Sequence, residues 1–96
     1  MASVVSNQEL KILACIELNE MYGYQILQKL GSIMKMGSLY GALKSLERKG
    51  FVTARWGEEN GPGGRRRYYK ISAEGGNVLA MERESLIKAG VFRLST

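Results

Sequence analysis

The chain has 96 residues, the size of one small domain with little stability to spare. Its 14 Lys and Arg residues outnumber its 9 Asp and Glu residues, and the net charge of +5 favours an anionic partner. There is no His, there is one Cys, and the carboxylates are scattered, so an internal disulfide is excluded and no catalytic or metal-ligand set is recognisable. We therefore expect neither an enzyme nor a cofactor.

The sequence also lacks the signals of export or membrane insertion. No apolar run approaches the ~18 residues that cross a bilayer, and the N-terminal segment has no basic start followed by an apolar stretch. We interpret the single Cys15 as a small buried hydrophobe in a reducing compartment. A cytoplasmic protein with no membrane partner is expected.

The first predicted helix runs from about Gln8 to Leu18, because Ser6 and Glu9 have the spacing of a capping box, and residues 1–6 are expected to be flexible. This helix has two apolar sides, one made by Leu10, Leu13, Ala14 and Leu18 and the other by Ile12, Cys15 and Ile16. One side should pack in the domain core and the other against a partner, unless a long final helix of the same chain covers it.

A second helix is predicted from Met21 to Leu30. Tyr24 near its start either donates its hydroxyl to a phosphate or is a core aromatic, and both alternatives stay open. Residues 34–36 are expected to form a short strand or an extended link. Lys35 then lies beside the start of the third helix, where it can contact a phosphate.

The third helix, which begins near Gly37, separates apolar from polar side chains. At about 100° per residue, Leu39, Leu43 and Leu46 share one narrow face. The opposite face carries Tyr40, Gly41, Lys44, Ser45 and Arg48. Such a helix is either an ordinary surface helix or one that presents small, hydroxyl and cationic groups to an anionic partner.

A hairpin is predicted after Gly50, with strands at residues 51–56 and 65–71 and a glycine-rich turn at residues 57–64. The return strand begins with Arg65, Arg66 and Arg67, which are either a solvated charge run or a phosphate clamp. Glu47 lies in the last turn of the third helix, where the helix dipole disfavours a carboxylate. We expect it to pair with a cation of the hairpin.

The distribution of charge decides between these alternatives. Residues 29–70 hold ten Lys or Arg against three Glu, whereas residues 1–28 hold one Lys against three Glu, and residues 71–96 hold three of each sign. The excess positive charge is therefore confined to one helix and one hairpin. This confinement indicates a nucleic-acid footprint, because charge that serves solubility alone would be spread along the chain.

The last predicted helix begins after Ser72, a suitable N-cap residue, and continues to about residue 89, with residues 90–96 as a loose tail. Gly75 and Gly76 weaken its first turn by about 1 kcal/mol each relative to alanine. Its broad apolar face consists of Val78, Leu79, Met81, Ser85, Leu86 and Ala89. A helix this marginal needs packing against another element.

Several motifs together resemble the PadR family of bacterial winged-helix transcriptional regulators. They are Tyr22-Gly23-Tyr24, the run GSLYGALKSLERKGFV, Trp56, and RRRYYKIS followed by Glu74 and Gly75. The resemblance covers roughly residues 8–80. It implies a mostly α fold with a small β-hairpin, that is, a winged helix-turn-helix domain at residues 7–71 and a C-terminal dimerisation helix at residues 72–89.

The resulting prediction is a homodimeric, sequence-specific regulator, a repressor, that binds an inverted repeat in double-stranded DNA. The residues assigned to DNA binding are Tyr24, Lys35, Ser38, Tyr40, Gly41, Lys44, Ser45, Arg65, Arg66 and Arg67. Those assigned to the dimer interface are Ile12, Cys15, Ile16, Val78, Leu79, Met81 and Leu86.

The alternatives are a winged helix that binds another protein and an RNA-binding module, although the few aromatic residues make a single-strand platform less suitable. Some members of the resembled family bind flat aromatic effectors between their C-terminal helices. Here residues 71–91 contain no aromatic residue, so the sequence does not support an aromatic-drug sensor, while an effector of another kind stays open.

Overall fold

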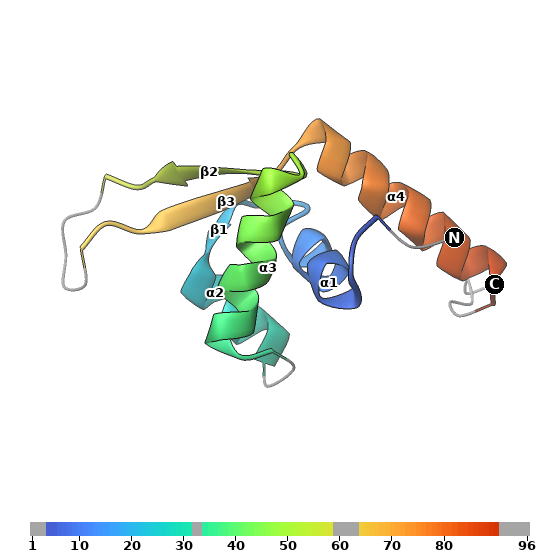
Figure 1. Ribbon diagram of the computed structural model, residues 1–96, viewed down its shortest axis with the longest axis horizontal. Helices are drawn as coiled ribbons and strands as arrows, with labels where there is room; N and C mark the ends of the chain where they lie inside the picture. The colour runs from blue at the N-terminus through green and yellow to red at the C-terminus, as the bar shows by residue number, and fades with distance from the viewer. Residues whose placement is uncertain (1–3, 32–33, 59–63, 91–96) are drawn as a thin grey trace.

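The computed structural model describes residues 4–31, 34–58 and 64–90. The elements in chain order are α1 (Asn7–Cys15), β1 (Met21–Tyr22), α2 (Gly23–Leu30), α3 (Met36–Arg48), β2 (Val52–Trp56), β3 (Arg67–Ile71) and α4 (Ala73–Lys88). The hairpin of β2 and β3 and the helix α4 extend from the body in opposite directions (Figure 1). Strands β2 and β3 form the wing of the fold.

Helix α1 begins with the predicted capping box. The Glu9 N–H donates to Ser6 Oγ at 3.1 Å, and the Ser6 N–H donates to Glu9 Oε1 at 2.8 Å. The helix ends at Cys15, earlier than predicted, and Leu18 is 88% exposed. Before this helix, Val5 is buried in the core and Ser6 caps α1. Residues 1–3 lie outside the described residues.

The sheet has three antiparallel strands in the order β1-β3-β2, one more than the predicted hairpin. Met21 and Tyr22, expected to open the second helix, pair instead with Tyr69 and Tyr68 of β3. This pairing satisfies backbone groups that β3 would otherwise leave without partners on that edge. A strand at residues 34–36 is not formed, since Lys35 is the extended N-cap residue of α3 and Met36 is already helical.

One core joins α1, α2, α3, the sheet and the start of α4. The fully buried side chains include Ile12 and Leu13 of α1, its C-cap residue Ile16, and Leu79 of α4. From α2 and α3 the core receives Ile26, Leu39, Leu43 and Leu46. The leucine spacing therefore predicted the inner face of α3 correctly, because residues three and four apart share one side of a helix.

Helix α4 starts where the sequence predicts, with the Gly75 N–H donating to Ser72 Oγ at 3.0 Å. A Cβ atom on Gly75 would lie 2.1 Å from the Phe51 carbonyl oxygen, so the glycine allows α4 to start directly against the turn between α3 and β2. Farther along α4, the guanidinium of Arg83 forms an ion pair with the carboxylate of Glu17 at 2.7 Å.

In the part of the chain that the structure describes, no helix is both long enough and apolar enough to cross a membrane.

Candidate nucleic-acid interface

The outer face of α3 carries the side chains that the sequence placed there. Ser38, Tyr40, Gly41 and Lys44 are all exposed, while the leucines behind them are fully buried. Lys35, immediately before the helix, is exposed at its N-cap. A Cβ atom on Gly41 would meet nothing within 4 Å, so the surface is open at this position. The predicted separation of the two faces of α3 is confirmed.

Tyr40 is held against the start of α2. A Cβ atom on Gly23 would lie 2.5 Å from the Tyr40 hydroxyl oxygen, so only a glycine leaves room for this ring. Tyr40 nevertheless remains 46% exposed, and the neighbouring Tyr24 is 53% exposed. Tyr24 is therefore not a core aromatic, which removes one of the two alternatives left by the sequence.

Each of the three wing arginines is oriented by a contact within the chain. Arg67 Nη2 donates to Glu47 Oε2 at 3.1 Å, and its guanidinium lies 5.1 Å from the centre of the Trp56 ring. The Arg66 guanidinium lies 4.6 Å from the centre of the Tyr22 ring. Arg65 Nε donates to the Gly57 carbonyl at 2.9 Å. The predicted pairing of Glu47 with a cation of the hairpin is confirmed.

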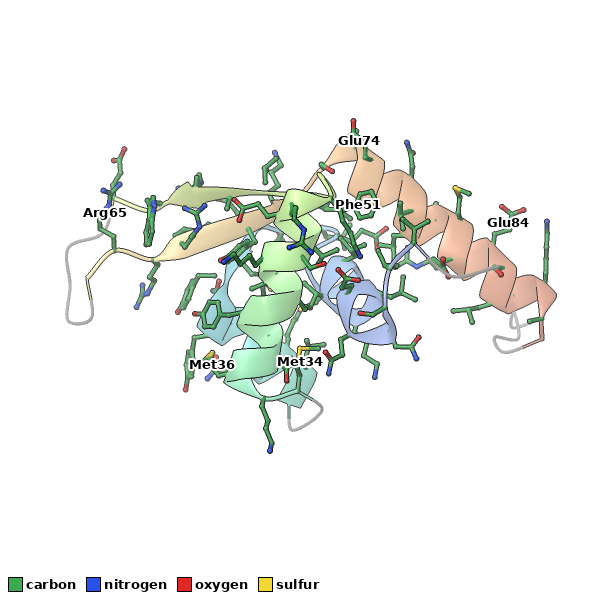
Figure 2. The ribbon with its side chains drawn as sticks, in the orientation of Figure 1. Met34, Met36, Phe51, Arg65, Glu74 and Glu84 are labelled. Carbon is green, nitrogen blue, oxygen red and sulfur yellow. The ribbon has the colours of Figure 1, made fainter. Side chains whose placement is uncertain are left out.

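A groove of about 470 Å³ separates the wing from α2 and α3. Its lining consists of Tyr22, Gly23, Tyr24, Tyr40, Trp56, Gly64, Arg65, Arg66, Arg67 and Tyr69. None of the described residues that line it is acidic. Figure 2 shows Arg65 far out along the wing and Glu84 toward the opposite end of the molecule on α4. The cationic surface is therefore well separated from the end of α4.

Ser45 does not lie with the other predicted contact residues. It is half-buried, and a hydrogen bond from its hydroxyl contributes to lowering the pKa of the Glu9 carboxyl. Ser45 therefore lies near Glu9 of α1, at the edge of the exposed face. The angular prediction was too coarse here, because Ser45 lies at the boundary between the two faces of α3.

A model of the transcriptional regulator PadR-like family matches residues 12–81. The chain belongs to this family. Among solved structures, a PadR family transcription regulator from Clostridium difficile R20291 is 27% identical, with a TM-score of 0.79 over 88% of this chain and 92% of the other. The protein smu.1704 from Streptococcus mutans UA159 is 30% identical, with a TM-score of 0.67 over 99% and 100% of the two chains.

A third solved structure is Bacillus subtilis PadR in complex with operator DNA. It is 23% identical, with a TM-score of 0.69 over 94% of this chain and 49% of that one. At this identity the match shows a shared fold. A search of curated protein sequences gave no match.

Part of the predicted dimer interface of this PadR-like chain is wrong. Ile12, Ile16 and Leu79 are at most 1% exposed within the single chain, so they have no surface to offer a partner. Cys15 is half-buried, with its Sγ 3.9 Å from Met21 Sδ, and burial raises the pKa of its thiol. The side of α1 thought to face a partner is thus enclosed by the domain itself.

The remaining assigned interface residues lie on α4. Met81 is 69% exposed, and Val78 and Leu86 are half-buried. A second groove of about 340 Å³ between α1 and α4 is lined by Asn7, Leu10, Lys11, Ala14, Leu79, Arg83 and Leu86. Helix α4 of the same chain thus approaches the Leu10 side of α1, and this was the alternative that the sequence left open.

Two contributors to the interface were missed from the sequence. Trp56 and Tyr22 line the groove and carry Arg67 and Arg66 on their rings. The pairing of Trp56 with Arg67 across β2 and β3 puts both on the same face of the sheet, and strand register is the signal that could have shown it. Across residues 4–31, 34–58 and 64–90, no group of three or more His, Cys, Asp or Glu residues is placed to hold a metal ion.

Proposed function

We propose that this PadR-like regulator is a homodimeric repressor that binds an inverted repeat in double-stranded DNA through α3 and the wing. The observation that carries this proposal is the ion pair between Glu47 and Arg67, which joins the exposed α3 surface to the arginine-bearing strand. A helix with a cationic face beside a cationic hairpin matches the major groove and the adjacent phosphate backbone of a duplex. The likeness to Bacillus subtilis PadR, solved with operator DNA, supports the choice of ligand.

In this mode α3 enters the major groove with its exposed face toward the bases. Lys44 and Tyr40 are the residues that we assign to base edges, while Ser38 and Gly41 allow close approach of the helix. Ser45 is left out of this set, because its hydroxyl serves the Glu9 carboxylate. The residues that contact phosphates are Tyr24, Lys35, Arg65, Arg66 and Arg67.

The surface that we assign to the dimer is the outer side of α4 together with the edge of α1. Met81 and Ile87 are 69% and 40% exposed on α4, and Leu10, Ala14 and Leu86 line the groove between the two helices. Apolar side chains exposed along a protruding helix are typical of a protein interface. Two-fold symmetry then requires half-sites about 34 to 36 Å apart, or a multiple of this distance.

Recovery of bound fragments from genomic DNA tests the function directly. We expect the protein to retain a small set of duplex fragments that share an inverted repeat, and to lose affinity steeply as salt rises. Equal binding to every fragment, or none, would contradict sequence-specific recognition. Stronger competition by single-stranded RNA than by duplex DNA would favour the RNA-binding alternative.

The dimer is tested separately by sedimentation at micromolar concentration. Met81→Asp places a charge on a side chain that is already exposed in the single chain, so it should leave the fold intact and dissociate the dimer. Thr53→Asp, at an exposed position on β2, is the control and should remain dimeric. A monomeric parent protein would contradict the proposal.

A further inference from the structure

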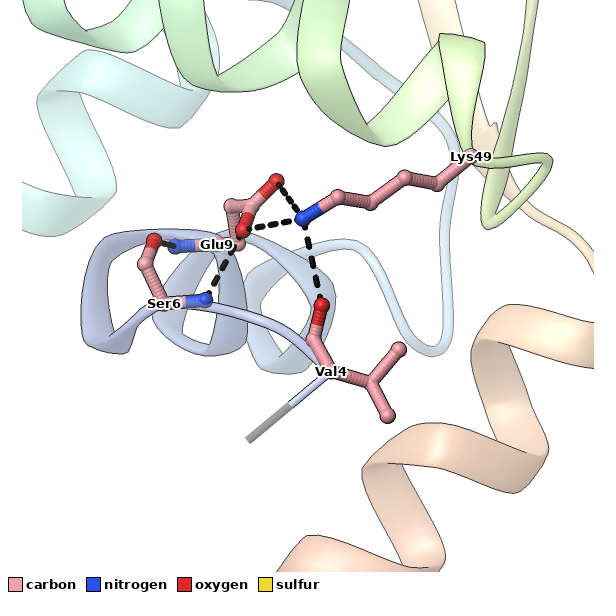
Figure 3. A network of polar contacts seen from close by, with 4 residues as sticks. All are labelled: Val4, Ser6, Glu9 and Lys49. Carbon is pink, nitrogen blue, oxygen red and sulfur yellow. Dashed lines mark hydrogen bonds and ion pairs between the residues drawn. The ribbon is translucent and has the colours of Figure 1, made fainter. Parts of the chain in front are cut away.

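A polar network connects the end of α3 with the beginning of α1 (Figure 3). Lys49, the C-cap residue of α3, places its Nζ 3.0 Å from Glu9 Oε1 and 3.1 Å from Glu9 Oε2. The same Nζ donates to the Val4 carbonyl at 3.1 Å. Glu9 Oε1 also accepts the Ser6 N–H of the α1 capping box. One carboxylate therefore holds the N-terminal segment, α1 and α3 together across 40 residues of sequence.

This network is more buried than the other ion pairs. The Glu9 side chain is 6% exposed, whereas every other side chain in a described ion pair is at least 31% exposed. The Lys49 side chain keeps 33% of its surface exposed, so the cost of lost hydration falls mainly on Glu9. An ion pair with a buried member contributes little net stability compared with apolar residues of the same volume, because the buried charge loses its hydration. Its effect adds to the packing of the two helices, because a hydrogen bond depends strongly on the angle between its groups, whereas the hydrophobic attraction is not directional.

We propose that Glu9 and Lys49 are positioning residues that fix the angle between α3 and α1 and thereby set the half-site spacing that the dimer accepts. This inference rests on the proposed function, in which α3 reads DNA and α1 and α4 form the dimer. Helix α3 has 13 residues and is about 20 Å long. A rotation of about 10° at its Lys49 end moves its other end by about 3 Å, close to the 3.4 Å rise of one base pair.

The double variant Glu9→Gln with Lys49→Met tests this role without leaving an unpaired buried charge. Glutamine keeps the capping box, and the methionine keeps most of the volume of the lysine. The matched control is Glu20→Gln with Arg55→Met, which removes an ion pair whose side chains are 32% and 55% exposed, lies outside the surfaces assigned to the dimer and to DNA, and leaves the net charge equal to that of the double variant. Lys49→Arg, which retains a cation able to reach Glu9, tests for rescue.

Binding is measured on duplexes that carry the selected half-site twice, with the spacer changed one base pair at a time, and on a single half-site. The parent, the control and Lys49→Arg should prefer one spacer by about tenfold or more. The double variant should bind the single half-site within about twofold of the parent, and its preference among spacers should fall below about threefold. Circular dichroism establishes that each variant is folded.

The outcomes separate the two proposals. A double variant with the spacer profile of the parent would overturn the positioning role while leaving the proposed function intact. A parent that shows no spacer preference would overturn the dimeric function and this role together. Should the double variant unfold at the assay temperature, Glu9→Gln alone takes its place, and an unchanged spacer profile in that variant would likewise overturn the positioning role.

Discussion

Glu47 near the end of α3 and Arg67 at the start of β3 form an ion pair with an oxygen–nitrogen distance of 3.1 Å. Arg67 also lies over the ring of Trp56, so three elements meet at this point. The pair links the helix that we assign to base reading with the strand that leads into the wing. The helix dipole disfavours a carboxylate at the position of Glu47, and the pairing with Arg67 offsets this cost.

Removal of this pair should affect the wing more than the stability of the domain. The two side chains are 31% and 39% exposed, so Glu47→Gln should lower the free energy of unfolding by no more than about 1 kcal/mol. The emission of Trp56, the only tryptophan, should change because Arg67 loses its anchor. Urea denaturation and steady-state fluorescence measure the two effects. An unchanged spectrum would show that the ion pair does not hold Arg67 on the ring.

Replacement of all three wing arginines should weaken binding to every duplex. In Arg65→Ala, Arg66→Ala, Arg67→Ala, the slope of log affinity against log salt should decrease by about 0.9 for each phosphate that the variant no longer neutralises. The control removes three cations elsewhere, namely Lys11, Arg83 and Lys88, and should keep the parental slope provided that sedimentation shows the parental assembly. A wing variant with the parental slope would exclude the wing from the DNA site.

Lys44→Ala should change the choice of sequence. Because Lys44 is exposed on the outer face of α3, removal of its ammonium group should reduce discrimination at particular base pairs by about 1 to 3 kcal/mol. Selection from a randomised duplex library measures this change, with Lys29→Ala, at an exposed position on α2, as the control. An identical preference profile for Lys44→Ala and the parent would assign base reading to other residues.

Two adjacent glycines of α4 should respond in opposite ways to alanine. A Cβ atom on Gly75 would lie 2.1 Å from the Phe51 carbonyl oxygen, so Gly75→Ala must push α4 away from the α3–β2 turn and should cost about 1 to 3 kcal/mol or more. Gly76 has nothing within 4 Å of such an atom, and Gly76→Ala should stabilise the helix by up to about 1 kcal/mol. Thermal denaturation of both variants provides the comparison, and equal melting temperatures would contradict the close approach at Gly75.

The stability of the domain should depend on pH through Glu9. Burial opposes its ionisation, but the Ser6 N–H, Lys49 and Ser45 together outweigh burial and lower its pKa. A group whose folded-state pKa is lowered stabilises the fold above its ordinary pKa and loses this contribution as pH falls through the folded-state value. The free energy of unfolding should therefore fall more steeply below about pH 5 for the parent than for Glu9→Gln. Parallel curves from urea denaturation would contradict this assignment.

Local patterns in the sequence were sufficient for most elements of the fold. The capping box at Ser6, the leucine spacing of α3 and the N-cap at Ser72 depend on residues within about one helical turn of each other, so they can be read without the tertiary structure. The positive charge confined to residues 29–70 likewise indicates nucleic acid from the sequence alone. The position of Glu47 in the last turn of its helix predicts a cationic partner, because the helix dipole disfavours a carboxylate there.

The tertiary structure decided what depends on partners distant in the chain. The local sequence at Met21 and Tyr22 is compatible with the start of a helix. These residues form a strand because the edge of β3 is available for pairing. Ile12 and Ile16 are core residues because α2 and α3 pack against a side of α1 that periodicity alone marks only as apolar. Glu9 meets Lys49 across 40 residues, a separation at which chain folding and not local spacing determines which charges meet.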